Sequence, residues 1–350
     1  MTTVGVFSEM AAGADWPWYT CDGPAGADSS GLRLAATDRA ADWALCINFP
    51  VWPKGAGMLP WWKRRAARLA GRYEDLKTDT AFAWLGTPAE RTLFLWYEPP
   101  AIARRYYAAS VRHCRRVWAP DDAPHPGVTP ATLPAWWTLR HDVHALRCLQ
   151  PRDQAIALSA VTSGKSALAG HRDRLAFIRA LRSSGVPMHL FGWELPADLS
   201  PGGVIGDKSA LLAASRCTLA IENDPSSDRY VSEKFWDPLL SWSVPLYFGG
   251  RAPDTLVPPE AFIRLPDLGP AGLETVRAAV ADPDVRTRRL DAIAQARRIA
   301  LDRLRLPLWL ADRLGELRPD ATHAQRGPQP AARPAAERPA LGPDLAQPSA

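Results

Sequence analysis

Short apolar runs that end in polar residues recur along the first 120 positions of the chain. Four of these runs predict strands: TTVGVF (2–7), ADWALCINF (41–49), RTLFLWYE (91–98) and RRVWAP (115–120). RTLFLWYE is apolar almost to its end, as expected for a strand that is covered on both faces. Helices are predicted between the runs, over Leu59–Arg72 and Ala101–His113. Strands that alternate with helices indicate a parallel sheet with crossover connections.

The alternation starts again after a break near Pro151. Four more runs predict strands: IALSAVTS (156–163), MHLFGW (188–193), CTLAIEN (217–223) and VPLYFGG (244–250). The segment HRDRLAFIRALRSSG (171–185) predicts a helix that ends at Ser-Gly. We therefore predict two α/β domains, 1–150 and 151–283, joined near residues 146–153.

The last part of the chain has a different pattern. Residues 284–318 predict a basic amphipathic helix, which Pro307 interrupts. Its leucines and isoleucines, such as Ile293 and Leu301, recur at helical spacing on one face. Residues 319–350 hold seven prolines among alanines and show no apolar periodicity. This tail is predicted to be disordered.

Length and composition agree with two domains in a reducing compartment. A chain of 350 residues is too long for one compact core. The N-terminal stretch MTTVGVFSEM lacks the charged and apolar regions of a signal peptide, and no run approaches the roughly 20 apolar residues that span a bilayer. The five cysteines form no C-x-x-C pair, which argues against a disulfide framework and a zinc site. We expect a cytoplasmic protein.

The net charge of +5 and the pI near 9.1 permit phosphate-bearing ligands, nucleic acid or an anionic membrane surface. Nucleic acid is not expected, because the aromatic residues do not alternate with Lys and Arg as in a stacking platform. Much of the basic excess falls in 284–318, which predicts either a peripheral contact with the inner face of an anionic membrane or a helix packed on the other domains. The fifteen tryptophans, Trp61 and Trp62 among them, are interpreted mainly as core residues, with sugar-stacking surfaces as the alternative.

Three short motifs that often carry chemistry are incomplete here. SGKS (163–166) lacks the earlier glycine of a P-loop, because Ser159 stands at that position. D-P-D (282–284) has the D-x-D spacing of metal-dependent sugar transferases, but helix capping explains it better at this place. His141 and His144 lack the glutamate of an H-E-x-x-H zinc motif. None of these motifs is expected to carry the function.

The stretch 217–250 combines several features of a phosphate site. In an open α/β sheet, ligands bind beyond the carboxyl ends of strands, and both predicted strands here end in polar or glycine residues. Ser232 can cap a following helix, which places Glu233 and Lys234 in its first turn. A lysine there opposes the helix dipole unless an anion binds at the same end. A solvated lysine is the alternative interpretation.

This stretch resembles the C-terminal signature of the α-1,3-fucosyltransferases of the bacterial type, glycosyltransferase family ten. LAIEND, DRYVSEK and VPLYFGG are similar to the family's F-E-N, Y-[VI]-T-E-K and [VI]-P-[VI] elements, with Ser232 in place of threonine and Ile221 in place of phenylalanine. SGKSALAGHRDRLAFIRAL (163–181) resembles the family's donor loop, and PPEAFIRLPDL (258–268) its closing stretch. The resemblance covers about residues 90–270.

The resemblance implies an α/β fold of the GT-B type, with two Rossmann-like domains facing each other across a cleft. It implies GDP-fucose as the donor and inverting transfer to a hydroxyl of an N-acetylglucosamine-type acceptor, in an α-1,3 linkage, as in oligosaccharide, lipopolysaccharide or protein glycosylation. Six residues match the family's donor site: Arg174, Glu222, Asn223, Tyr230, Glu233 and Lys234. Arg174 and Lys234 would also neutralise the departing pyrophosphate, so no metal cofactor is expected.

Glu98 matches the E-x-P element in which the family carries its catalytic base. The prolines that follow, Pro99 and Pro100, cannot extend a ladder, so the carboxylate stands at a rigid strand end. A glutamate near its reference pKa of roughly 4.3 is ionised at neutral pH and can accept a hydroxyl proton. The residues alone are equally compatible with an ordinary strand-end acid, and the resemblance favours the general base.

Pro238 departs from the family pattern. Either the signature helix kinks there, or Asp237 caps a later helix, which would leave Glu233 and Lys234 on a loop. A retaining transferase would carry paired glutamates eight residues apart, whereas Glu222 and Glu233 are eleven apart. The alternative function is a homologue that uses another nucleotide sugar or acceptor, or one that binds a sugar nucleotide without catalysis.

Overall fold

The computed structural model describes residues 1–8, 30–36, 38–48, 60–123 and 125–317. The predicted disordered tail lies outside these ranges. The chain divides into two compact units, Met1–Asp312 and Arg313–Ala350. In the second unit the described residues form the end of a helix, where Arg313 pairs with Glu316 at 2.5 Å.

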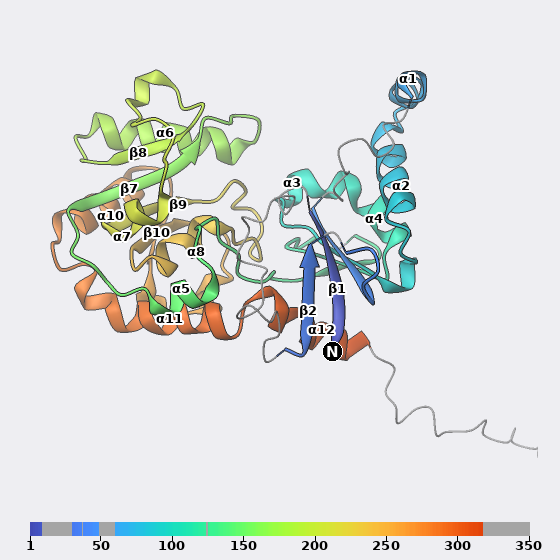
Figure 1. Cartoon of the computed structure of the whole chain (residues 1–350). Coiled ribbons are helices and arrows are strands. Elements are labelled where there is room, and N and C mark those ends of the chain that lie inside the picture. The colour runs from blue at the N-terminus through green and yellow to red at the C-terminus, as the bar shows by residue number, and fades with distance from the viewer. Residues whose placement is uncertain (9–29, 37, 49–59, 124, 318–350) are drawn as a thin grey trace, which may run out of the picture. The chain divides into compact units, whose positions relative to one another are not determined.

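Two parallel sheets form the framework of the first unit (Figure 1). The strands of the first sheet are β1 (Thr2–Ser8), β2 (Leu32–Ala36), β3 (Trp43–Ile47), β4 (Thr92–Leu95), β5 (Arg116–Ala119) and β6 (Val128–Pro130). Their order is β2-β1-β3-β4-β5-β6, and every described pair is parallel.

The second sheet repeats this plan. Its strands are β7 (Ile156–Ser163), β8 (His189–Trp193), β9 (Ser215–Ile221), β10 (Val244–Phe248) and β11 (Ile263–Arg264), in the order β11-β10-β9-β7-β8. In both sheets the first strand lies between the second and the third. Ligands of such sheets bind where the strand order reverses, which is between β1 and β3 and between β7 and β9.

Twelve α-helices are described, and most of them connect the strands. They are α1 (Trp61–Leu69), α2 (Tyr73–Leu85), α3 (Pro100–Ala103), α4 (Tyr107–His113), α5 (Val143–Cys148), α6 (Ala169–Ser183), α7 (Lys208–Ala213), α8 (Glu233–Leu240), α9 (Pro253–Leu256), α10 (Pro270–Ala281), α11 (Leu290–Asp302) and α12 (Leu306–Leu317). None of the described helices is long and apolar enough to cross a bilayer. The cysteines in the described chain are all unpaired.

The register of the first sheet explains its core. Phe7, Cys46 and Phe94 are aligned across β1, β3 and β4, so they point to the same face. α2 and α4, which lie side by side in Figure 1, cover this face with Phe82 and Tyr107 among others. Burial of these large apolar side chains holds the two helices on the sheet.

On the second sheet, helices cover both faces. Ile178 of α6 lies beside Ala160 and Leu219, which are neighbours on β7 and β9. α8 packs on the opposite face, where the Phe235 ring meets the Tyr247 ring at a centroid distance of 4.9 Å. The carboxyl ends of β7 and β9 therefore lie between α6 on one face of the sheet and the start of α8 on the other.

All eight strands predicted from the sequence are present, although several end one to three residues early. β2, β6 and β11 were missed. Each of them lies at the edge of its sheet, and β6 and β11 have only three and two residues. Edge strands bury less apolar surface and so leave a weaker pattern in the sequence.

The segment 284–318 is not one helix, and its apolar face is not free for a membrane. α11 buries Ile293 and Leu301 against the protein, packing on α8. Arg297 is also buried, donates to the carbonyl oxygens of Leu146 and Leu240, and lies 4.4 Å from the centroid of the Trp242 ring. The apolar surface and this arginine thus serve internal packing, which corrects the membrane prediction for this helix.

Candidate functional site

A pocket of about 370 Å³ lies at the carboxyl ends of β7 and β9, where the strand order reverses. Four cationic side chains and one carboxylate line it together with apolar residues: Val161, Thr162, Ser163, Lys165, Arg174, Gly192, Trp193, Val204, Ile205, Lys208, Asn223, Glu233 and Lys234. The excess of positive charge favours an anionic ligand.

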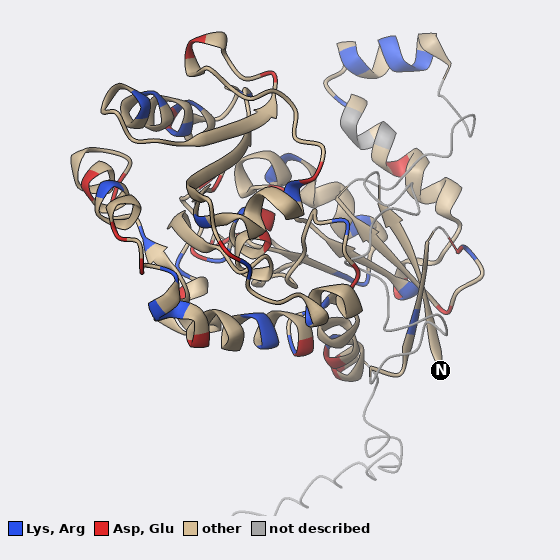
Figure 2. Cartoon of the chain, turned by 60° about the vertical axis from the view of Figure 1, so that its left-hand side comes forward, with Lys and Arg blue, Asp and Glu red and all other residues tan. Residues whose placement is uncertain are grey.

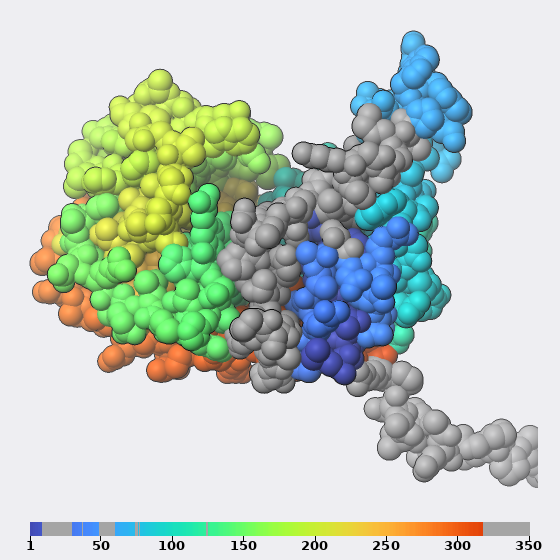
Figure 3. Space-filling model, viewed as in Figure 1, coloured from blue at the N-terminus to red at the C-terminus, as the bar shows by residue number. Residues whose placement is uncertain are grey.

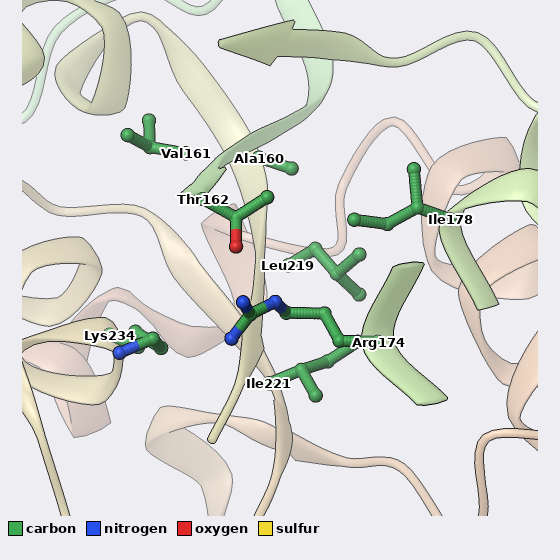
Figure 4. A pocket seen from close by; sticks show the side chains of 8 residues that line it. All are labelled: Ala160, Val161, Thr162, Arg174, Ile178, Leu219, Ile221 and Lys234. Carbon is green, nitrogen blue, oxygen red and sulfur yellow. The ribbon is translucent and has the colours of Figure 1, made fainter. Parts of the chain in front are cut away.

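Arg174 enters the pocket from α6. Its guanidinium donates to Asn223 Oδ1 at 2.5 Å and to the Ser163 carbonyl oxygen at 3.4 Å, which ties α6 to the ends of β9 and β7. Figure 4 shows a small cavity that shares Val161, Thr162, Arg174 and Lys234 with this pocket, and in it the Arg174 side chain extends towards Lys234. Burial lowers the pKa of Arg174, yet an arginine remains charged at neutral pH. Arg174 Nε has no hydrogen-bond partner among the described residues.

Close approach of α6 to the end of β9 depends on Gly170. A Cβ atom at this position would lie 2.4 Å from the carbonyl oxygen of Asn223. Any larger residue would push the first turn of α6, and with it Arg174, away from the pocket.

Lys234 lies in the first turn of α8, as predicted. Ser232 is the N-cap, and its hydroxyl accepts from Lys234 N at 3.3 Å. Lys234 Nζ lies 3.0 Å from Glu233 Oε1, and both side chains are less than one-fifth exposed. Burial disfavours the ammonium, but Glu233 and Glu222 outweigh this effect and raise the pKa of Lys234. The lysine is therefore charged and partly desolvated, which strengthens its attraction for an anion.

Glu222 and Tyr230 lie beside the pocket without lining it. The fully buried carboxylate of Glu222 accepts from Ser232 N at 2.7 Å and from Ser232 Oγ at 2.6 Å. It thereby joins the end of β9 to the cap of α8. Gly249 makes room for this link, because a Cβ atom there would lie 2.5 Å from Glu222 Cγ. Tyr230 is also buried.

Pro238 lies inside α8 and marks neither the end nor the beginning of this helix. The helix runs continuously over Glu233–Leu240, and Asp237 does not cap a later helix. The buried Asp237 carboxylate accepts from Thr138 N and Thr138 Oγ1, at 3.0 and 2.6 Å, and from Lys208 Nζ at 2.5 Å. The signature residues therefore stand in a helical first turn, and Asp237 fixes that helix by side-chain contacts that the sequence did not reveal.

Glu98 lies two residues before α3, at the end of the first sheet. Asn48 follows β3 with a left-handed backbone (φ 58°), and its Oδ1 accepts from Tyr97 N at 2.7 Å and from Glu98 N at 3.1 Å. This side chain, directly after β3, holds the backbone of the proposed base beyond the carboxyl end of the neighbouring strand β4. Asn48 was not predicted from the sequence, although an asparagine directly after a buried strand could have been recognised as a candidate site residue.

Contacts bring the region of Glu98 close to the second sheet's pocket. Ala101 N, in α3, lies 3.5 Å from Asp224 Oδ2, next to Asn223. Burial raises the pKa of the half-buried Glu98, while the positive charges of Lys165 and Lys234 act in the opposite direction. A carboxylate with a raised pKa is a better proton acceptor once ionised. The structure thus brings together Arg174, Asn223, Glu233 and Lys234 in one pocket and adds Lys165. Glu98 lies outside the pocket lining but within electrostatic reach of Lys165 and Lys234.

Lys165 belongs to the SGKS loop that the sequence analysis set aside. The loop is no P-loop, but it follows β7 at the reversal point, and its lysine lines the pocket. The other two motifs stay outside the pocket. Asp282 accepts from Asp284 N and pairs with Arg288. No group of three or more His, Cys, Asp or Glu residues in the described ranges has the arrangement of a metal site.

Residues 158–274 match the family model described as "Glycosyltransferase family 10 (fucosyltransferase) C-term". The matched segment contains β8, β9, β10 and β11, all but the first two residues of β7, and every residue that lines the pocket. The family resemblance seen in the sequence is thereby confirmed for this segment, and it supports a glycosyltransferase. Glu98 lies outside the matched segment.

Several solved structures are similar to this chain at low identity. A mutant of T4 phage BGT in complex with UDP-glucose is 9% identical with a TM-score of 0.50, and the match covers 90% of this chain and 99% of that one. An alpha1,3-fucosyltransferase is 13% identical with a TM-score of 0.45, covering 83% and 81%. A glycosyltransferase from Rickettsia africae ESF-5 is 10% identical with a TM-score of 0.45, covering 90% and 97%. No relative was found among the curated proteins.

The phage match extends over both sheets, and it shows the fold alone. Together with the two parallel sheets, it confirms the predicted α/β class of the GT-B type.

Proposed function

We propose that this chain is a family 10 glycosyltransferase that transfers L-fucose from GDP-fucose, with inversion, to a hydroxyl of an N-acetylglucosamine-type acceptor in an α-1,3 linkage. The observation that carries the proposal is the division of the pocket into a cationic part and an apolar part. Arg174, Lys165 and Lys234 supply the charge, and Trp193 with Val204 supplies exposed apolar surface. A nucleoside diphosphate has the same two parts, an anionic diphosphate and a flat base.

In the proposed reaction the acceptor oxygen attacks the anomeric carbon of fucose, and its proton passes to the Glu98 carboxylate. The bond between that carbon and the diphosphate oxygen breaks, and GDP leaves with the electron pair. Lys234 and Arg174 stabilise the charge that grows on the leaving oxygen. Inversion follows when attack and departure occur on opposite faces of the sugar.

The experiment that tests the function is an assay of the full chain with GDP-fucose and a panel of sugar acceptors, with product linkage and anomeric configuration read by NMR. The expected product is an α-1,3-fucosylated N-acetylglucosamine unit. Transfer only from another nucleotide sugar would overturn the donor assignment. Binding of GDP-fucose without transfer to any acceptor would favour the non-catalytic alternative.

Trp193→Ala is expected to weaken GDP binding by about 5- to 150-fold, because stacking of a base on an aromatic side chain contributes roughly 1–3 kcal/mol. The Trp193 side chain is 62% exposed at the pocket, so its removal leaves no cavity in the core. Calorimetry with GDP and with inorganic pyrophosphate separates the two parts of the pocket. Trp61→Ala, at another exposed tryptophan, is the matched control.

Pyrophosphate affinity should be the same in Trp193→Ala and in the parent protein. An equal loss for GDP and pyrophosphate would show that the substitution disturbs the cationic part, and an unchanged GDP affinity would remove Trp193 from the base site.

We also expect the transfer to need no metal ion, since Arg174 and Lys234 can neutralise the diphosphate. Activity should stay within about twofold after dialysis against EDTA. Loss of activity that added Mg²⁺ or Mn²⁺ restores would contradict this expectation and would direct attention back to Asp282 and Asp284.

A further inference from the structure

α1 exposes an apolar and cationic surface that the proposed reaction does not use. None of its nine residues is buried. Trp61, Trp62 and Leu69 are 67%, 54% and 82% exposed, and they account for half of the large apolar side chains that are exposed in the described chain. Isolated exposed apolar residues are ordinary, but three on one short helix form a patch.

The side chains of α1 have a definite arrangement around the helix axis. At 100° per residue, Trp61, Trp62 and Leu69 fall within one third of the circumference. Ala67, on the opposite side, and Arg64, beside Trp61, are its less exposed residues, and α1 contacts α2. The helix therefore turns its aromatic face away from the protein, and Figures 1 and 3 show it at the end of α2 that lies away from the strands of the first sheet.

Charge on α1 is of one sign only. The sequence WWKRRAARL contains four basic residues and no acidic one, and Figure 2 shows blue but no red on this helix. Lys63 Nζ lies 5.4 Å from the centroid of the Trp62 ring. Trp61, Leu69 and three arginines also line one hollow of about 450 Å³, so apolar and cationic surface adjoin each other.

We propose that α1 binds the anionic surface of a lipid bilayer, with its tryptophans in the interfacial region and its lysine and arginines on lipid phosphates. Tryptophan is the residue that favours the boundary between headgroups and acyl chains, because its ring is apolar and its N–H is polar. Basic side chains beside it bury their stems and keep their charges at the headgroups. α11, whose apolar face is packed inside, cannot offer this combination.

Nucleic acid would also attract the charge, but it does not account for the aromatic face. Proteins that bind single-stranded nucleic acid place aromatic residues within a groove, where successive bases stack on them. The tryptophans of α1 instead lie on the exposed face of a helix. The proposal is independent of the donor and acceptor of the transfer reaction. It would hold the domain that carries Glu98 beside a membrane, where a lipid-linked acceptor could be reached.

The test is co-sedimentation of the full chain with vesicles of phosphatidylcholine alone and with 30% phosphatidylglycerol. Two double variants address the two parts of the surface: Trp61→Ser with Trp62→Ser, and Arg65→Glu with Arg68→Glu. Each should lower affinity for the anionic vesicles by about tenfold or more. Salt at 0.5 M should release the parent protein, since the attraction is partly electrostatic.

Arg251→Glu with Arg277→Glu changes the net charge equally at exposed positions elsewhere and should sediment like the parent. Thermal melts and GDP binding, unchanged in all variants, would show that the fold is intact. The proposal is overturned if the parent stays in the supernatant with anionic vesicles, or if both α1 variants sediment as the parent does. It is also overturned if the α1 variants lose binding to a single-stranded RNA but keep binding to vesicles.

Discussion

Glu98→Gln is expected to lower turnover by about 10²–10⁴-fold, the contribution of a positioned general base. The amide keeps the shape of the side chain and lacks the basic carboxylate. GDP affinity should remain near that of the parent, because Glu98 does not line the pocket of Arg174 and Lys234. Steady-state kinetics with GDP-fucose and calorimetry with GDP measure the two quantities separately.

The pH dependence provides a second readout. The base must be ionised, so turnover should fall as the pH drops through the pKa of Glu98. Burial raises this pKa, and the fall should therefore begin at a higher pH than an exposed glutamate would give. The acidic limb should disappear in Glu98→Gln.

Glu90→Gln, an exposed glutamate just before β4, is the matched control and should behave as the parent. Near-normal turnover in Glu98→Gln would exclude Glu98 as the base. A lost affinity for GDP would instead place this side chain in the donor site.

Arg174→Ala is expected to weaken the binding of GDP and GDP-fucose by about 10- to 150-fold. A hydrogen bond to a charged group contributes roughly 1.5–3 kcal/mol, and this guanidinium is buried, where the attraction to a diphosphate is strong. Turnover should fall as well, because the same charge stabilises the leaving group. Calorimetry and single-turnover kinetics separate the two effects.

Two further variants distinguish the loss of a direct contact with the diphosphate from a loss of binding that is caused by unfolding. Arg179→Ala removes an exposed arginine of the same helix, which pairs with Asp198, and should leave GDP binding unchanged. In the proposed complex Lys234 contacts the diphosphate from α8, so Lys234→Gln should weaken GDP binding in the same way. If Arg174→Ala keeps the GDP affinity of the parent and a native melting curve, Arg174 only joins α6 to Asn223.

The sequence was most informative where physical constraints are local. Strands such as β7 and β9 are buried on both faces, and their apolar runs define them without further context. The same holds for Ser232, Glu233 and Lys234, because capping requires a particular residue at a fixed spacing.

Contacts between distant segments could not be predicted from one sequence. Asn48 reaches Glu98 across fifty positions, and Asp237 reaches Thr138 across ninety-nine. Lys165 was set aside because its motif was incomplete, whereas its function in the pocket depends on the position of the loop after β7. The exposed Trp61 and Trp62 show the converse error, since aromatic content alone favoured burial.

Glu98 and the proposed donor site are both influenced by the charges of two lysines. In the free protein Lys165 and Lys234 favour the ionised form of Glu98. A diphosphate bound to these lysines would compensate part of their charge, and the proton affinity of Glu98 would rise. By thermodynamic linkage, donor binding would then be accompanied by partial proton uptake, and release of GDP by its return. The carboxylate would be more basic whenever the diphosphate is bound, and therefore also in the complex that holds the sugar to be transferred.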